Sequence, residues 1–452
     1  MKILIASMPI CMNDNEDFIS MRVAPTTAIY LLAAVVREQG FDLDVLDPYT
    51  IQTEVPESSL EEVIKNRLKN VDVLCLSSNT LNWANTVQAI KTVRKIFGSS
   101  IKIVIGGLHP SYFYKHVINN LEIDFVMRGE GEVTLPQLMR ALEENNGFEN
   151  IQGLVSKTFA ASEVNKIVPI IDNDIFKKLP LPAYDLMPDK VYNVLPVETS
   201  RGCQFNCAFC SVPHRNHWRG FDEAVVIERA EKIIKTYIHK FRTKQIFMTD
   251  DCLTADFDRA SNIMNKLMEI DKELVFMIET RATDWLKGDI SKAIDVFSKP
   301  NIGRLAFGIE CGYNEGLRRI SKGLTIELLE DTLQILEKNN MLRKTFFSFI
   351  VGFPWESMDE CLKTVDFAAN LEKRCGNRGN VNLNWLQIYP SNIWEQRKEF
   401  GIDATEEIFD DNFFIEEKYH DLFHPVLSFS EKRYVMKYID DYENIGTYLR
   451  NY

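Results

Sequence analysis

Short hydrophobic runs alternate with amphipathic helical patterns over the first 150 residues. The runs are KILIAS, DLDVLD, VDVLCLSS, IKIVIGG and IDFVMRG, and helical segments such as TAIYLLAAVVREQG and about Asn82 to Phe97 lie between them. This alternation is typical of a parallel sheet built from βαβ units. Residues 1–150 are therefore predicted to form a Rossmann-like α/β domain, which would bind ligands beyond the carboxyl ends of its strands.

A second alternating series follows an irregular stretch with several prolines at residues 151–191, which we interpret as a linker. Its strand patterns are VLPVETS, KQIFMTD, LVFMIETR, GRLAFGIECG, TFFSFIVGFP and NLNWLQIYP. Roughly six βα units predict a partial (β/α)6 barrel over residues 192–400, which is less than the eight units of a closed barrel. The acidic and aromatic tail, residues 401–452, is predicted to be a small helical C-terminal region.

Composition adds limits on the class of protein. The 452 residues are 45% hydrophobic and 26% charged, as in a folded globular protein, and the net charge of −13 argues against a nucleic-acid partner. No stretch approaches the ~18 apolar residues of a membrane span, and the first residues lack the apolar core of a signal peptide. We therefore expect a cytoplasmic protein, in which the nine cysteines are reduced and a cysteine cluster indicates metal.

One such cluster follows the first strand pattern of the predicted barrel. Cys203, Cys207 and Cys210 lie within eight residues, on a loop expected at the carboxyl end of that strand. Three thiolates can ligate three irons of a 4Fe-4S cubane and leave the fourth iron open, as in a catalytic metal site. The alternative is a zinc site with His214 or His217 as the fourth ligand.

The CxxxCxΦC spacing, with Phe209 before the last cysteine, resembles the signature of the radical S-adenosylmethionine (SAM) superfamily. The resemblance implies a reduced 4Fe-4S cluster that cleaves SAM to a 5′-deoxyadenosyl radical, and an external electron donor such as flavodoxin or ferredoxin. It also implies that strand-end residues bind SAM. By position these are Phe209, Asp250, Asp251, Glu279, Arg281, Glu310 and Gly352.

Some of these residues also have structural interpretations. The Asp250–Asp251 pair could cap a helix, and Gly352 could mark the turn before Pro354. Glu310 ends an otherwise apolar strand pattern, so its carboxylate needs a partner that offsets its desolvation.

The N-terminal half resembles the cobalamin-binding branch of the same superfamily. IGGLHPS at 105–111, RGEGE at 128–132 and LPLPAYDL at 179–186 carry this resemblance. It implies cobalamin on the strand ends of the first domain. The residues expected to contact it are Ser77, Ser78, Gly106, Gly107, Gly129, Glu130 and Gly131. The Asp-x-His-x-x-Gly motif of many cobalamin proteins is absent, and His109 is interpreted as a loop residue rather than a cobalt ligand.

The resemblance therefore implies a cobalamin-dependent radical SAM enzyme that methylates an unactivated carbon of a small-molecule or peptide substrate. A cyclase or rearrangement enzyme that uses cobalamin without methyl transfer remains open, as does a noncatalytic sensor that binds cobalamin or the cluster. A methylthiotransferase is disfavoured, because its first domain should hold a second cluster on three cysteines and residues 1–150 contain only Cys11 and Cys75. The sequence does not identify the substrate.

Overall fold

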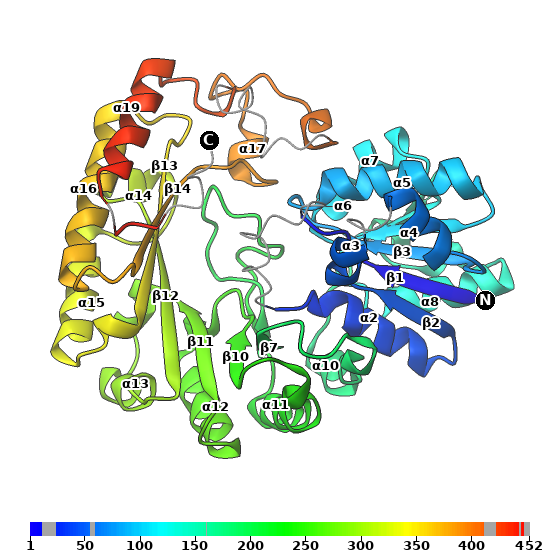
Figure 1. The fold of residues 1–452 in the computed structure, drawn as a ribbon, viewed down its shortest axis with the longest axis horizontal. Coiled ribbons are helices and arrows are strands. Elements are labelled where there is room, and N and C mark those ends of the chain that lie inside the picture. The colour runs from blue at the N-terminus through cyan, green and yellow to red at the C-terminus, as the bar shows by residue number, and fades with distance from the viewer. Residues whose placement is uncertain (11–23, 55–58, 160, 411–421, 443, 447–452) are drawn as a thin grey trace. The chain divides into compact units, whose positions relative to one another are not determined.

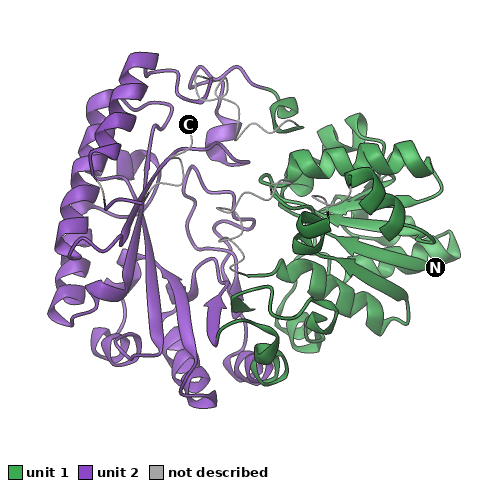
Figure 2. Ribbon diagram, viewed as in Figure 1, with its two compact units in different colours: residues 1–196, 232–243, 405–413 green, residues 197–231, 244–404, 414–452 purple. Residues whose placement is uncertain are grey.

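The computed structural model describes residues 1–10, 24–54, 59–159, 161–410, 422–442 and 444–446. The chain divides into two compact units, coloured separately in Figure 2. Unit 1 comprises residues Met1–Pro196, Lys232–Thr243 and Thr405–Phe413, and unit 2 comprises Val197–Glu231, Lys244–Ala404 and Phe414–Tyr452. Residues 151–191, interpreted from the sequence as a linker, thus belong to unit 1.

A six-stranded sheet forms the centre of unit 1, in the order β2-β1-β3-β4-β5-β6. The strands are β1 (Lys2–Ala6), β2 (Asp42–Leu46), β3 (Val73–Ser77), β4 (Lys102–Gly106), β5 (Phe125–Met127) and β6 (Leu154–Ser156). The first five are parallel, as the sequence predicts, and β6 is an antiparallel edge strand that the sequence pattern did not predict. The order 2-1-3-4-5 places the switch point of this sheet between β1 and β3, where ligands of such folds bind.

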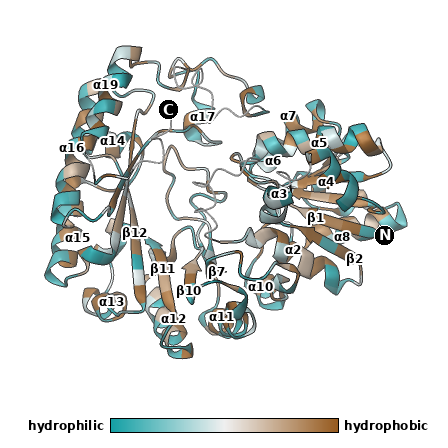
Figure 3. Ribbon diagram, in the orientation of Figure 1, coloured by the Kyte–Doolittle hydropathy of each residue, from teal (hydrophilic) through white to brown (hydrophobic). Residues whose placement is uncertain are grey.

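Helices cover both faces of this sheet, as α2 and α5 show in Figure 1. Each presents an apolar side to the strands, and Figure 3 shows the strands as mainly hydrophobic. The longer helices are α2 (Thr27–Glu38), α4 (Leu60–Arg67), α5 (Trp83–Phe97) and α8 (Thr134–Glu144). The shorter ones are α3 (Pro48–Glu54), α6 (Leu108–Tyr112), α7 (Tyr114–Asn120), α9 (Glu163–Lys166), α10 (Asn173–Lys178) and the 3₁₀ turns η1 (Phe148–Asn150), η2 (Tyr184–Leu186), η3 (Ile238–Lys240) and η7 (Glu406–Asp410).

Unit 2 is built on a second six-stranded sheet, in the order β14-β13-β12-β11-β10-β7. Its strands are β7 (Val194–Val197), in which unit 1 gives way to unit 2, β10 (Gln245–Met248), β11 (Val275–Thr280), β12 (Ile302–Glu310), β13 (Thr345–Val351) and β14 (Val381–Trp385). The pairs from β10 to β14 are all parallel. Six strands of this kind confirm the predicted partial barrel.

The helices of unit 2 lie on one side of its sheet, as Figure 1 shows for α12, α13, α15 and α16. On β13, Phe347, Phe349 and Val351 are buried, whereas Phe346, Ser348 and Ile350 are half-buried. We call the side of the sheet that carries these half-buried residues its open face. The elements around the sheet are α11 (Glu223–Tyr237), η4 (Leu253–Ala255), α12 (Phe257–Ile270), η5 (Ala282–Leu286), α13 (Ile290–Phe297), α14 (Asn314–Arg319), α15 (Ile326–Lys338), η6 (Leu342–Lys344), α16 (Met358–Arg374), α17 (Asn392–Glu395) and α19 (Phe429–Asp440).

Helix starts in unit 2 follow local sequence signals. Ser357 and Glu360 form a capping box at α16, in which each side chain accepts a hydrogen bond from the other residue's backbone N–H. Asp256, rather than the Asp250–Asp251 pair, caps α12. None of the helices in the described ranges is long and apolar enough to cross a membrane.

Candidate functional site

The three cysteines lie on a loop that is closed at its base. Strands β8 (Ser200–Arg201) and β9 (Arg219–Gly220) pair antiparallel. The loop of residues 202–218 therefore begins and ends at this pair of strands. Gly202 has a φ of +76°, and a Cβ there would collide with the carbonyl oxygen of His217. In the middle of the loop, Ala208 donates to Ile320 O at 2.9 Å and accepts from Ile393 N at 3.0 Å. The backbone next to Cys207 is therefore held from two sides.

Each cysteine sulfur has a hydrogen-bond donor beside it. Arg281 Nη1 is 3.7 Å from Cys207 Sγ, and Val212 N is 3.4 Å from Cys210 Sγ. The pKa of Cys203 is lowered to about 6 by a hydrogen bond from the Cys252 thiol, with smaller help from the Phe205 N–H and the Arg281 charge. Burial raises the pKa of Cys210 to about 11. Donors to the sulfurs stabilise thiolate ligands and tune an iron–sulfur cluster, so this donor set fits a 4Fe-4S cluster.

The zinc alternative requires one cation to bind several side chains at once. Within the described ranges, no three His, Cys, Asp or Glu side chains converge closely enough to hold a single metal ion. A cubane differs, because each cysteine binds a different iron.

Asp250 braces the start of the cysteine loop. It is 2% exposed, and its Oδ1 accepts from Thr199 Oγ1 at 2.6 Å, from Ser200 Oγ at 2.5 Å and from Thr199 N at 3.2 Å. Arg259, from α12, donates to the carbonyl oxygens of Thr199 and Phe221 at 2.7 and 2.6 Å. Burial raises the pKa of Asp250 to about 6, against these hydrogen bonds. The hydrogen bonds of this carboxylate thus go to the protein's own loop.

Asp251 and Arg281 approach the loop from two neighbouring strand ends. Asp251 Oδ2 accepts from Gly202 N at 2.9 Å. The Arg281 guanidinium lies 3.6 Å from the ring centroid of Phe205, and Arg281 also donates to the Lys322 carbonyl oxygen. The side chain of Arg281 thus connects the cysteine loop to residues beyond β12.

Glu310, at the end of β12, forms a buried ion pair. Its Oε1 is 2.9 Å from Lys322 Nζ, and the side chains of Glu310 and Lys322 are 9% and 6% exposed. Glu310 has a φ of +75°, and the pairing of β12 with β13 shifts register at this point. Such a backbone costs about 1–3 kcal/mol in a residue other than glycine and clusters at functional sites. Lys322 also lies 5.8 Å from the Phe209 ring.

Gly352 ends β13 in a tightly packed turn. Its φ is +80°, and a Cβ there would collide with the ring of Trp385. Glu356 accepts from Gly352 N and Phe353 N at 2.7 and 2.9 Å, and its pKa is raised to about 7 by burial. His424 donates from Nδ1 to the Gly352 carbonyl oxygen. This turn meets the cysteine motif, since the rings of Phe353 and Phe209 are 6.2 Å apart.

A continuous set of contacts therefore joins most of the predicted SAM residues to the cysteines. It runs from Cys207 through Arg281 and Lys322 to Glu310 and Phe209, with Asp251 attached at Gly202. Glu279 is different, because it lies within β11, before the strand end that Arg281 follows, and has no contact in this set.

The predicted cobalamin residues lie at the carboxyl edge of the sheet in unit 1. Ser77, Gly106 and Gly107 are half-buried there. Gly107 has a φ of +104°, and a Cβ would collide with the backbone of Ser78, so this loop crossing requires glycine. Nearby, Leu81 and Leu108 remain 37% and 42% exposed. An edge with accessible backbone and large apolar side chains fits a broad, largely apolar ring such as a corrin.

Ser78 and Glu130 mainly hold the loops of that edge together. Ser78 Oγ is 2.8 Å from Asn82 Oδ1, and Asn82 Nδ2 donates to Ser7 Oγ at 3.1 Å. Glu130 accepts from Ile171 N at 2.5 Å. Gly129 is required by packing, since it has a φ of +79° and a Cβ there would lie 2.6 Å from Pro169 O, whereas a Cβ at Gly131 would lie 3.3 Å from the end of the Leu32 side chain.

His109 is a core residue of α6. It is fully buried, its ring is stacked on Trp83 at 4.2 Å, and its Nδ1 is 3.1 Å from Thr80 Oγ1. Burial lowers its pKa well below the usual range. The interpretation of His109 as a loop residue is therefore wrong, because the residue lies in a helix and is packed in the core; that it is not a cobalt ligand stays a prediction.

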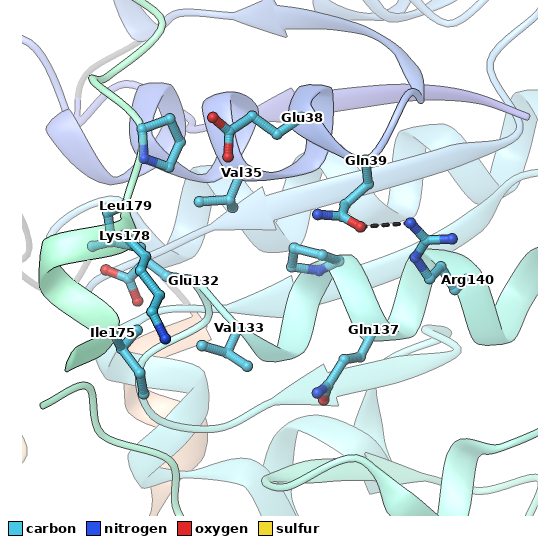
Figure 4. Close-up of a pocket in the computed structure, with 12 residues that line it drawn as sticks. Val35, Glu38, Gln39, Glu132, Val133, Gln137, Arg140, Ile175, Lys178 and Leu179 are labelled. Atoms are coloured by element: carbon cyan, nitrogen blue, oxygen red, sulfur yellow. Dashed lines mark hydrogen bonds between the residues drawn. The ribbon is translucent and has the colours of Figure 1, made fainter.

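The two hollows found in unit 1 lie mostly away from these residues. One, of about 310 Å³, lies between α2, α8 and α10, where Figure 4 shows Gln39 hydrogen-bonded to Arg140. Its lining includes no residue predicted to bind a cofactor. A neighbouring hollow of about 210 Å³ includes Glu130.

Sequence reasoning missed four residues that shape the site in unit 2: Arg259, Lys322, Glu356 and His424. Lys322 and Glu356 lie close to predicted residues in the sequence, and a search for partners of Glu310 and for a carboxylate after the Gly352 turn could have found them. Arg259 and His424 come from α12 and from the C-terminal region, and no local signal marks them.

Comparisons with known proteins agree with this arrangement. Residues 197–368 match the radical SAM superfamily, and residues 22–139 match the B12 binding domain. An uncharacterized methyltransferase of Pyrococcus horikoshii is 27% identical, with 77% of this chain and 74% of the relative covered. The anaerobic magnesium-protoporphyrin IX monomethyl ester cyclase of Rubrivivax gelatinosus is 24% identical, with 85% and 68% covered.

The fold is also that of a solved cobalamin-dependent enzyme. The structure of OxsB, a cobalamin-dependent S-adenosylmethionine radical enzyme with aqua-cobalamin bound, superimposes with a TM-score of 0.66 at 20% identity. The match covers 88% of this chain, and this chain spans 56% of that one. The chain therefore belongs to the radical SAM superfamily, in the branch that carries a B12 binding domain ahead of the radical SAM domain.

Proposed function

We propose that this protein uses SAM and cobalamin to methylate an unactivated carbon of a small-molecule or peptide substrate. The observation that carries the proposal is the contact set in unit 2, in which Arg281 links the cysteine loop to the Glu310–Lys322 pair. A methyltransferase among the relatives supports methyl transfer. A one-electron donor such as flavodoxin or ferredoxin would reduce the protein in the cytoplasm.

Cys203, Cys207 and Cys210 would hold a 4Fe-4S cluster. When bound, the cluster and cobalamin supply the reductive cleavage of SAM and a carrier for its methyl group. The protein's own residues would position the cluster. Arg281 keeps positive charge beside the Cys207 sulfur, and Asp250 and Arg259 fix the loop that carries the three cysteines. Positive charge stabilises the thiolate form of a cysteine.

Five of the strand-end residues would surround SAM: Phe209, Asp251, Arg281, Glu310 and Gly352. Gly352 allows the Trp385 ring to pack against the backbone of its turn, and this turn contacts Phe209 through Phe353. We assign Asp250 to the support of the loop, because its oxygens already accept hydrogen bonds from Thr199 and Ser200. We assign Glu279 to a deeper position on β11.

In unit 1, the seven predicted residues would form the cobalamin edge. Ser77, Gly106 and Gly107 would offer backbone groups, with Leu81 and Leu108 against the ring. Ser78 and the Gly129–Gly131 loop, with Glu130, would shape this edge through their packing.

The test is anaerobic reconstitution with iron, sulfide, cobalamin, methyl-labelled SAM and a one-electron reductant. Methyl transfer predicts S-adenosylhomocysteine and 5′-deoxyadenosine together, both lost in Cys207→Ala and retained in Cys375→Ala. Cys375 is a matched control, since it is a buried cysteine at the end of α16, away from the loop.

A second candidate is radical cyclisation or rearrangement, which the cyclase among the relatives favours. It predicts 5′-deoxyadenosine with a modified product and no S-adenosylhomocysteine. Binding of both cofactors with neither product would contradict both enzymatic functions and support a noncatalytic sensor.

A further inference from the structure

Two opposite charges lie on the open face of the second sheet, below the strand ends. Arg304 is the third residue of β12, and Glu279 is the fifth residue of β11. Met277 pairs with Arg304, and Glu279 pairs with Ala306, so the two charged residues are diagonal neighbours. Both strands alternate, with Ile278, Leu305 and Phe307 buried on the helix side.

The guanidinium of Arg304 has no hydrogen-bond partner among the described residues. Its guanidinium lies 3.9 Å from the ring centroid of Phe346, on β13, but it donates no hydrogen bond to any residue that the structure describes, and its Nε is buried. It forms no ion pair with Glu279, although the two interact electrostatically. A half-buried guanidinium has five N–H donors and needs acceptors for them.

The neighbours of Arg304 on the open face follow from the strand pairing. Across three neighbouring strands, Glu279, Ala306 and Phe346 stand in one row. The central member is only a methyl group, so the Arg304 side chain can pass over it to the Phe346 ring. The ring and Ala306 make the floor apolar, and Arg304 and Glu279 supply one charge of each sign.

This row lies one layer below the cysteine contacts. Glu279 lies on β11, and Arg281 follows the end of that strand two residues later, which is about 7 Å at ~3.3 Å per residue; Arg281 contacts Cys207. The residues proposed above to hold SAM lie around the cysteine loop, so an anion held by Arg304 in the lower row would belong to another molecule. That molecule would lie next to SAM.

We propose that Arg304 binds a carboxylate of the substrate, so that the substrate of this protein is a carboxylic acid. A guanidinium binds a carboxylate through two parallel hydrogen bonds. The row has no net excess of positive charge, because Glu279 faces the same space, and this favours a singly charged carboxylate over a doubly charged phosphate. Glu279 would accept a hydrogen bond from a donor group of the same substrate. This inference rests on the proposed function, but its binding test requires no turnover.

The test uses probes rather than the unknown substrate. Binding of 4-fluorobenzoate, 4-fluorobenzamide and phenyl phosphate to the reconstituted, SAM-loaded protein is measured by fluorine and ligand-observed proton NMR. We expect the benzoate to bind at least ~10-fold more tightly than the neutral amide, as a charge-assisted hydrogen-bond pair provides, and more tightly than the phosphate.

Variants of Arg304 and Glu279 distinguish the effect of a lost charge from a loss of folding. Arg304→Met should remove the preference for benzoate, and Arg304→Lys should keep part of it. Glu279→Gln should strengthen benzoate binding, because it removes a negative charge from the same space. Arg343→Met is the matched control, since Arg343 is exposed on η6 before β13, and it should behave as the wild type.

The proposal is overturned if the wild type binds the benzoate and the amide equally or binds neither, or if the preference survives in Arg304→Met. Tighter binding of phenyl phosphate would overturn the carboxylate assignment. Release of 5′-deoxyadenosine, measured in parallel, reports on the proposed function alone, so the two failures are distinguishable.

Discussion

The brace at Asp250 makes a prediction about stability against pH. Asp250→Asn removes the charge but keeps an oxygen at the Oδ1 position, which accepts all three hydrogen bonds from Thr199 and Ser200. The pKa of Asp250 is raised by burial from 3.8 to about 6. Because the folded state disfavours the ionised carboxylate, the wild type is stabilised by this group below its unfolded pKa and loses that stability as the pH rises through about 6.

The size of the effect follows from the shift. Asp250 is fully buried, so no reduction for solvent screening applies, and raising its pKa from 3.8 to about 6 corresponds to about 3 kcal/mol. About half of this, roughly 1.4 kcal/mol, is lost between about pH 5 and pH 8, and the rest below about pH 5. Relative to the wild type, Asp250→Asn should therefore gain about 1.4 kcal/mol in its free energy of unfolding over that range.

Urea denaturation of the apo protein at several pH values measures this difference, since the other titrating groups are common to both proteins. Asp250→Ala serves as the second variant, because it removes the acceptor as well as the charge. It should lower the iron content after reconstitution, whereas Asp250→Asn should retain it. A stability difference that is flat with pH, or that favours the wild type more at higher pH, would refute the assignment of Asp250 as a buried brace.

Three further predictions concern other contacts. Lys322→Met leaves Glu310 buried without its partner and should lower the free energy of unfolding by about 3–5 kcal/mol, with partial recovery in the Glu310→Gln/Lys322→Met double variant; equal stability would contradict the ion pair. Gly352→Ala places a Cβ against Trp385 at a positive φ and should destabilise by about 2–4 kcal/mol in thermal unfolding. Asp410→Asn should lower the pKa of His116, which is raised mainly by its hydrogen bond to Asp410, in an NMR titration of labelled histidine; an unchanged pKa would contradict that contact.

The alternation of apolar runs and helices was enough to predict both sheets. This prediction succeeded because the parallel strands of βαβ units are largely buried, so that each strand has a short run of hydrophobic residues in the sequence. Strand β6 was missed because it has three residues and lies at an antiparallel edge. The spacing of Cys203, Cys207 and Cys210 predicted their common loop, since a local spacing requires no knowledge of tertiary contacts.

The partners of the site residues could not be predicted from the sequence, for a physical reason. Lys322 reaches Glu310 because β12 ends in a register shift and Glu310 adopts a positive φ, and neither feature has a sequence pattern. The role of Asp250 depends on the position of its carboxylate relative to a loop about 50 residues earlier in the chain. The sequence shows that Asp250 is a carboxylate at a strand end, but it does not show which groups the carboxylate oxygens face.

The central claim is that three cysteines hold a cluster that cleaves SAM. The most direct measurement is the amount of 5′-deoxyadenosine formed by the anaerobically reconstituted protein with SAM and reductant. The account predicts its formation by the wild type and by Cys375→Ala, and its loss, together with the iron, in Cys207→Ala. Full retention of iron and of 5′-deoxyadenosine in Cys207→Ala would contradict the account.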